Sequence, residues 1–67
     1  MYTFEAGKTY GNWVSGLKRT VVKRTKCYVV FKGGMKKRIR TRKIGDEETE
    51  YIPARFKEFI VWAAAEW

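Results

Sequence analysis

The chain has 67 residues, among them 15 Lys or Arg, 7 Asp or Glu and no His, which gives a net charge of +8 and a pI near 9.9. A chain of this length folds as one domain with a thin core, and its 45% hydrophobic content is too high for a disordered chain. Without histidine the commonest general base and metal ligand is missing, and a single cysteine, Cys27, cannot form an internal disulfide. We therefore expect one folded domain, residues 1–67, that is not an enzyme and holds no metal or cofactor.

The sequence predicts no targeting or membrane segment. The first residues, Met1 to Glu5, lack the basic and apolar pattern of a signal peptide. The longest apolar run, Phe59 to Ala65, is far shorter than the roughly 20 residues that cross a bilayer. We expect a cytoplasmic protein with no membrane partner, and the unpaired cysteine agrees with that compartment.

Glycines punctuate the first fifty residues at short intervals, which is typical of a small meander barrel. A short opening segment, Tyr2 to Phe4, leads to the first turn. An acidic turn after Gly45 separates the last two strands. The five predicted strands are Lys8–Trp13, Leu17–Lys23, Cys27–Lys32, Met35–Ile44 and Thr49–Ile52.

The hydrophobic period changes at Pro53, which suits the first turn of a helix. From Pro53 to Trp67 the apolar residues recur at spacings of three and four, and Ala63 to Ala65 add helix propensity. This pattern predicts an amphipathic C-terminal helix of about four turns. The expected fold is mainly β: an SH3-like five-stranded barrel, residues 1–52, capped by one α-helix, residues 53–67.

The stretch from Lys18 to Lys43 holds twelve Lys or Arg residues and no Asp or Glu. A folded sheet with so much charge of one sign loses stability through self-repulsion, and a bound polyanion relieves that repulsion. Successive side chains of a strand point to opposite faces. The fourth predicted strand therefore places four cations in a row on one face: Lys36, Arg38, Arg40 and Arg42.

The hairpin loop at Gly33-Gly34 decides which residues of the third strand join this row. A loop of two residues pairs Lys32 with Met35, and it places beside the arginines the side chains of Cys27, Val29 and Phe31. A loop of three residues, Gly33 to Met35, pairs Lys32 with Lys36, and it places there instead Tyr28 and Val30. A slip of one residue exchanges the faces of every side chain.

The three-residue loop is the preferred register, because it leaves the amphipathic Tyr28 on the basic face. It also buries one apolar set together: Cys27, Val29, Phe31 and Ile39. Cys27 is then an inert, buried thiol. Aromatic and basic groups interleaved on a sheet are how small barrels bind nucleic acid, through phosphate contacts and base stacking.

These patterns predict a sequence-nonspecific nucleic-acid-binding module, because no helix-turn-helix, zinc-finger or RNA-recognition motif is present. DNA and RNA, single-stranded or double-stranded, remain open as the polymer. Tyr28 is expected to stack on a base. The phosphate contacts are expected from Arg19, Lys23, Lys36, Arg38, Arg40 and Arg42.

The predicted helix allows two interpretations. Either a barrel this small wraps the apolar residues of the helix on all sides, or Trp62 and Trp67 form an exposed patch. An exposed aromatic patch marks an interface, here with a partner protein or with a second copy in a homodimer.

Two segments, Glu5-Ala6-Gly7-Lys8-Thr9-Tyr10 and Val22-Lys23-Arg24-Thr25-Lys26, resemble a group of small phage- and prophage-associated bacterial proteins. The basic segment Lys36-Lys37-Arg38-Ile39 and the acidic turn Asp46-Glu47-Glu48 fit the same pattern, so the resemblance covers Phe4 to Ile52. It implies a viral or mobile-element origin and a bacterial host cell, and it lends no biochemical function. It also suggests an alternative function as an inhibitor of a host protein or ribonucleoprotein, such as a CRISPR effector, nuclease or polymerase. Such an inhibitor would use the basic sheet and the Trp-bearing helix.

Overall fold

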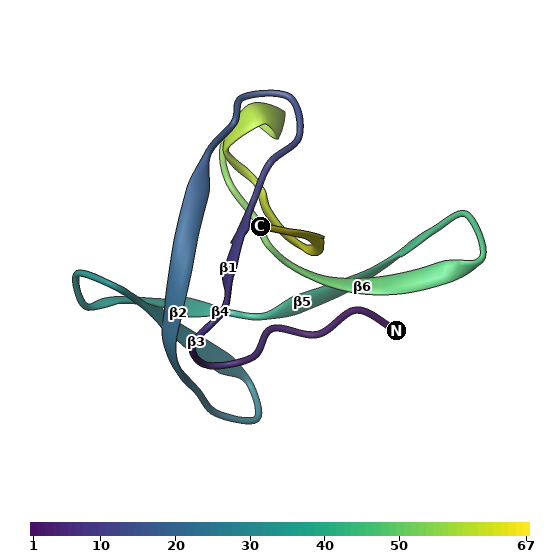
Figure 1. The fold of residues 1–67 in the computed structure, drawn as a ribbon. Helices are drawn as coiled ribbons and strands as arrows, with labels where there is room; N and C mark the ends of the chain where they lie inside the picture. Colours follow the sequence, from purple (N-terminus) through teal and green to yellow (C-terminus); the bar gives the residue numbers. More distant parts are fainter.

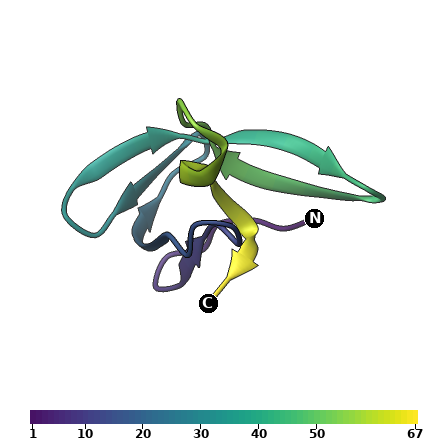
Figure 2. The same ribbon diagram turned by 90° about the horizontal axis from the view of Figure 1, so that it is seen from above.

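The computed structural model describes all 67 residues and contains a single curled antiparallel sheet (Figures 1 and 2). Its seven strands, in chain order, are β1 (Thr9–Gly11), β2 (Lys18–Arg24), β3 (Tyr28–Phe31), β4 (Met35–Arg38), β5 (Arg40–Ile44), β6 (Glu47–Ile52) and β7 (Val61–Glu66). Their order across the sheet is β4-β3-β2-β1-β7-β6-β5. The two edge strands, β4 and β5, follow each other in the chain, so the edges of this half-barrel are joined at Ile39.

The predicted C-terminal α-helix is wrong, and with it the helix-capped five-stranded barrel. The chain has no α-helix; one 3-10 turn, η1 (Lys57–Phe59), precedes β7. Strand β7 pairs with both β1 and β6, so residues 53–67 belong to the sheet instead of capping it. The run Ile60 to Ala65 is apolar throughout, so its hydrophobic pattern fits the two-residue period of a strand as well as the three- to four-residue period of a helix. Two free strand edges override the helix propensity of its alanines.

The predicted fourth strand is divided by a bend at Ile39. The Ile39 N–H donates to the Cys27 carbonyl oxygen at 2.8 Å, and the Ile39 side chain packs against the core. Before the bend the chain pairs with β3, and after it with β6. The two hairpins β3–β4 and β5–β6 consequently extend to opposite sides of the molecule (Figures 1 and 2).

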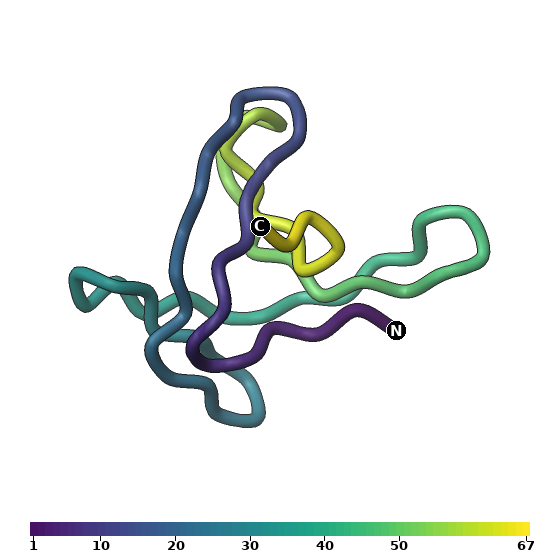
Figure 3. Tube along the Cα trace, viewed as in Figure 1, coloured from purple at the N-terminus to yellow at the C-terminus, as the bar shows by residue number.

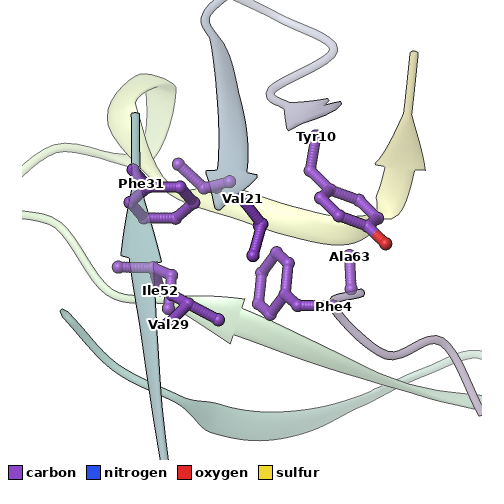
Figure 4. Packing of buried hydrophobic residues seen from close by; sticks show 8 residues of the cluster. Phe4, Tyr10, Val21, Val29, Phe31, Ile52 and Ala63 are labelled. Atoms are coloured by element: carbon purple, nitrogen blue, oxygen red, sulfur yellow. The ribbon is translucent and has the colours of Figure 1, made fainter. Parts of the chain in front are cut away.

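The core lies on the concave face of the sheet (Figure 4). The ring of Phe4 meets the rings of Tyr10 and Phe31 edge-on, with centroids 4.9 and 6.5 Å away. Phe4 belongs to the N-terminal segment, which runs beside the β5–β6 hairpin (Figure 3) and bonds to β6 on both sides of Thr49. The buried hydrophobic cluster comprises Phe4, Tyr10, Val21, Val29, Phe31, Ile52, Val61 and Ala63.

The β3–β4 hairpin has a three-residue loop, Lys32 to Gly34, in which both glycines adopt positive φ. The loop lies one residue earlier than preferred from the sequence, so Phe31 pairs with Met35. The assignment of faces is nevertheless correct: Val29 and Phe31 are buried, while Tyr28 and Val30 lie on the other face. The expectation of a buried Cys27 is wrong, because Cys27 lies in the turn before β3 and is exposed.

No helix in the structure has the length and the apolar composition needed to cross a membrane.

Candidate nucleic-acid interface

A row of four cations follows the outer, convex face of β4 and β5. Because Ile39 points into the core, its neighbours Arg38 and Arg40 point outward, and alternation continues through both strands. All four side chains are exposed, and none has a carboxylate within 4 Å. We call this row the basic ridge: Lys36, Arg38, Arg40 and Arg42.

Strand β3 supplies the neighbours of the ridge on one side. Tyr28 is half-buried opposite Arg38, and the Nζ atom of Lys36 lies 4.7 Å from the centroid of its ring. Beyond β3, Lys23 of β2 pairs with Val30, which itself pairs with Lys36. Four of the predicted site residues are therefore brought together here: Lys23, Tyr28, Lys36 and Arg38.

A β-bulge at Val22 puts Lys23 on this face. Val21 pairs with Phe31 and Lys23 pairs with Val30, so two steps on β2 oppose one step on β3. Val21 therefore faces the core while Lys23 faces outward, although regular alternation would place both residues on the same face. The bulge also turns Arg24 inward.

Arg19 lies on the opposite side of the sheet from the ridge. It pairs with the buried Tyr10 and is half-buried on the concave face. Of the six cations predicted to contact phosphate, Arg19 alone is separated from the others by the sheet.

An aromatic stack continues the outer face across β6 and β7. Tyr51 and Trp62 are cross-strand partners with ring centroids 5.2 Å apart and planes inclined by 30°. Trp13 also stacks with Trp62, with ring centroids 6.2 Å apart and planes inclined by 27°. Arg40 of the ridge is the cross-strand partner of Tyr51, so cation and stack form one row over three strands. We call Trp13, Trp62 and Tyr51 the aromatic stack.

Asn12 fixes the loop that carries Trp13. Its buried amide Nδ2 donates to the carbonyl oxygens of Lys57 and Ile60 at 2.8 and 2.9 Å. Its Oδ1 accepts from the N–H groups of Val14 and Ser15 at 2.9 and 3.3 Å. One side chain thus ties the loop to the segment around η1, and this holds Trp13 against Trp62.

Two open hollows border the aromatic stack. The hollow beside Tyr51 measures about 510 Å³ and is lined by Arg38 and Arg40. The hollow beside Trp13 measures about 330 Å³ and is lined by the cations Arg42 and Lys57. Each hollow combines aromatic lining with two positive charges.

Arg24 is unavailable to an external anion. It forms a bidentate ion pair with the buried Glu50, whose Oε1 also accepts the Phe4 N–H at 2.8 Å. Burial raises the pKa of Glu50, but the hydrogen bonds from Arg24 and Phe4 together outweigh it and hold the pKa below its ordinary value. The same hydrogen bond raises the pKa of Arg24. Of the fifteen Lys and Arg residues, only Arg24 and Lys8 take part in ion pairs.

The sequence prediction missed Trp13 and Tyr51. A two-residue loop at Gly45-Asp46 pairs Ile44 with Glu47 and, four steps on, Arg40 with Tyr51. This pairing follows from the length of the turn alone, so the sequence could have predicted that Tyr51 lies opposite Arg40. The position of Trp13 carried no such signal, because it depends on the contacts of Asn12 across the fold.

Trp62 and Trp67 lie on a strand and at its end, so the helical patch expected for a homodimer or partner protein is absent. Trp62 belongs to the aromatic stack. Trp67 is exposed, and the Nζ atom of Lys18 lies 4.4 Å from the centroid of its ring.

Comparison with protein-family models, curated proteins and solved structures gives no match to this chain. The resemblance to phage-associated proteins therefore stays a prediction, and the function is inferred from the chemistry of the outer face.

Proposed function

We propose that the protein binds nucleic acid without sequence specificity and without catalysis, through its outer face. The observation that carries this proposal is the row in which an unpaired basic ridge meets the aromatic stack at Arg40 and Tyr51. Phosphates neutralise the ridge, and bases stack on the rings. Lys23 and Tyr28 extend the same surface, whereas Arg19 takes no part.

The aromatic stack favours a single-stranded polymer. In a duplex the faces of the bases are covered by their neighbours, whereas an unpaired base can lie on an exposed ring. Stacking of one base on an aromatic side chain contributes about 1–3 kcal/mol and tolerates any base. The hollows beside Tyr51 and Trp13 each accept a base next to two cations.

Binding of labelled single-stranded DNA, RNA and duplex DNA over a range of salt tests this proposal. With about four phosphates neutralised, the logarithm of the affinity for a single strand should fall against the logarithm of salt with a slope near −3. The double variant Arg38→Ala/Arg40→Ala should weaken binding of every sequence alike and flatten that slope. Unchanged affinity in this variant would remove the ridge from the site.

A matched control removes the same charge elsewhere. Lys43 and Arg55 are exposed cations outside the ridge, and Lys43 lies opposite Glu48. Lys43→Ala/Arg55→Ala should therefore retain most of the affinity. Equal losses in the two double variants would show that net charge alone attracts the polymer. Tighter binding of duplex than of single strands would contradict the role given to the stack.

The alternative, an inhibitor of a host protein or ribonucleoprotein in the bacterial cytoplasm, keeps the basic ridge but loses the Trp-bearing helix. Its supporting outcome is a complex with a host protein that survives nuclease treatment and depends on Trp62.

A further inference from the structure

An apolar hollow opens at one end of the concave face, between the β3–β4 hairpin and residues 53–60. Its volume is about 320 Å³, which is within the range of ligand pockets. Its floor is formed by core side chains, and Met35 and Phe59 at its rim are 44% and 52% exposed. The apolar walls come from Leu17, Phe31, Met35, Ile52, Phe59 and Val61.

Three cations surround this hollow: Arg19, Lys37 and Arg55. No Asp or Glu is among the lining residues, and none of the three cations takes part in an ion pair. Arg19 is half-buried, and the only side-chain hydrogen bond it makes is from Nη1 to the Lys18 carbonyl oxygen at 3.2 Å. A partly buried cation without a counter-charge is costly, and an anion seated at the hollow would offset that cost.

We propose that this hollow is a docking site for an acidic segment of a partner protein that inserts one bulky apolar side chain. The apolar walls accept the side chain, and the three cations pair with the flanking carboxylates. The site is separate from the proposed nucleic-acid surface, because Lys37 pairs with the buried Val29 and so points to the concave side, whereas Lys36 and Arg38 point outward.

The lining favours a peptide side chain over a nucleic-acid base. Apart from the three cations, every residue around the hollow is apolar; none is Asp, Glu, Asn, Gln, Ser or Thr. Every base carries at least one N–H donor on its edge, which would find no side-chain acceptor in this hollow, and an unpaired buried donor is costly. An aliphatic or aromatic side chain has no such requirement.

Strand β4 supplies a second reason for an extended peptide. It hydrogen-bonds to β3 alone, so the backbone groups of its other edge are available to a further strand. Lysines on an edge repel another copy of the same basic strand, which protects the chain from self-association. The same lysines attract an acidic strand.

The test uses the full chain and a short labelled peptide of Asp and Glu with one central phenylalanine. Lys37→Ala/Arg55→Ala should weaken peptide binding about tenfold, because two partly exposed ion pairs are lost. Ala54→Trp should abolish it by filling the hollow without changing charge; Ala54 is exposed in the lining segment, which makes unfolding a poor explanation. Circular dichroism verifies that each variant is folded.

Three comparisons can overturn the proposal. A peptide whose phenylalanine is replaced by serine should bind at least tenfold more weakly, and equal binding would mean a purely electrostatic contact. Arg40→Ala/Arg42→Ala, which removes ridge cations from β5 and none from β4, should leave peptide binding unchanged while weakening binding of single-stranded DNA. Loss of DNA binding in Ala54→Trp, with no peptide binding by the unsubstituted protein, would assign the hollow to nucleic acid.

Discussion

Arg24 and Glu50 show how one residue in a run of cations acquires a different role from its neighbours. The β-bulge at Val22 turns Arg24 into the concave side, where Glu50 and the Phe4 backbone hold it. Glu50 sits on β6 and Phe4 in the N-terminal segment, so the pair joins three parts of the chain. Removing one partner leaves the other charge buried without compensation.

Arg24→Met should lower the free energy of unfolding by about 3 kcal/mol at neutral pH, because Glu50 is left as an uncompensated buried anion. The pH dependence of the free energy of unfolding should also change sign in this variant. In the natural protein the lowered pKa of Glu50 gives stability above about pH 4.5 that is lost as the pH falls through the folded value. Without Arg24, burial raises the pKa of Glu50, so acidification protonates the buried carboxylate and raises the free energy of unfolding. Urea unfolding between about pH 3 and pH 7 measures both effects.

The double variant Arg24→Met/Glu50→Gln serves as the control. Glutamine keeps an oxygen that accepts the Phe4 N–H and carries no charge, so part of the lost stability should return. Equal stability of the single and double variants would mean that the buried charge is not the cause.

At the scale of the element, two irregularities, the bend at Ile39 and the β-bulge at Val22, decide which side chains lie on the outer face of the sheet and which lie on the concave face. At Ile39 the chain stops pairing with β3 and begins to pair with β6, and the alternation of side chains continues through the bend. The bulge in β2 interrupts alternation once, and this single interruption turns Lys23 to the outer face and Arg24 to the core, the reverse of what regular alternation from Val21 would give.

Deletion of Val22 should leave the protein folded, because it removes the extra residue of the bulge: Val21 and Lys23 become consecutive, so Lys23 still faces outward opposite Val30 and Arg24 still faces the core opposite Val29. Val22→Thr should change the free energy of unfolding by less than about 0.5 kcal/mol, because Val22 is half-exposed and threonine is a good strand former. Thermal unfolding followed by circular dichroism compares the two. Loss of the cooperative transition in the deletion variant would show that the extra residue at Val22 is itself needed for folding.

At the scale of the whole molecule, repulsion among the cations opposes the stability that the hydrophobic core provides. The chain carries a net charge of +8, and thirteen of its fifteen cations have no carboxylate partner. Only 13 residues are buried, so little hydrophobic burial is available to offset self-repulsion. A bound polyanion on the outer face or an acidic segment at the concave hollow would relieve it.

Sodium chloride should therefore stabilise the protein. Between about 0.01 and 0.1 M the screening length falls from about 30 to about 10 Å, which weakens repulsion between the exposed cations. The urea midpoint should rise over this range, and it should rise less in Arg38→Ala/Arg40→Ala. A midpoint that falls with salt would mean that attractive ion pairs dominate the stability of the folded state.

The sequence by itself determined the basic ridge and the predominance of strands in residues 9–52. Both follow from local rules: side chains alternate along a strand, and glycines mark the turns. The same alternation placed Tyr28 beside the cations as soon as the apolar set of β3 was assigned to the core.

The tertiary structure alone decided the fate of residues 61–66, the inward turn of Arg24 and the aromatic stack. An apolar run such as Ile60 to Ala65 fits a helix or a strand equally well, and the choice depends on the free edges of β1 and β6. Trp13, Tyr51 and Trp62 come from three separate segments. Their stacking depends on long-range pairing, whose energy is distributed over the whole sheet and leaves no trace in any one stretch of sequence.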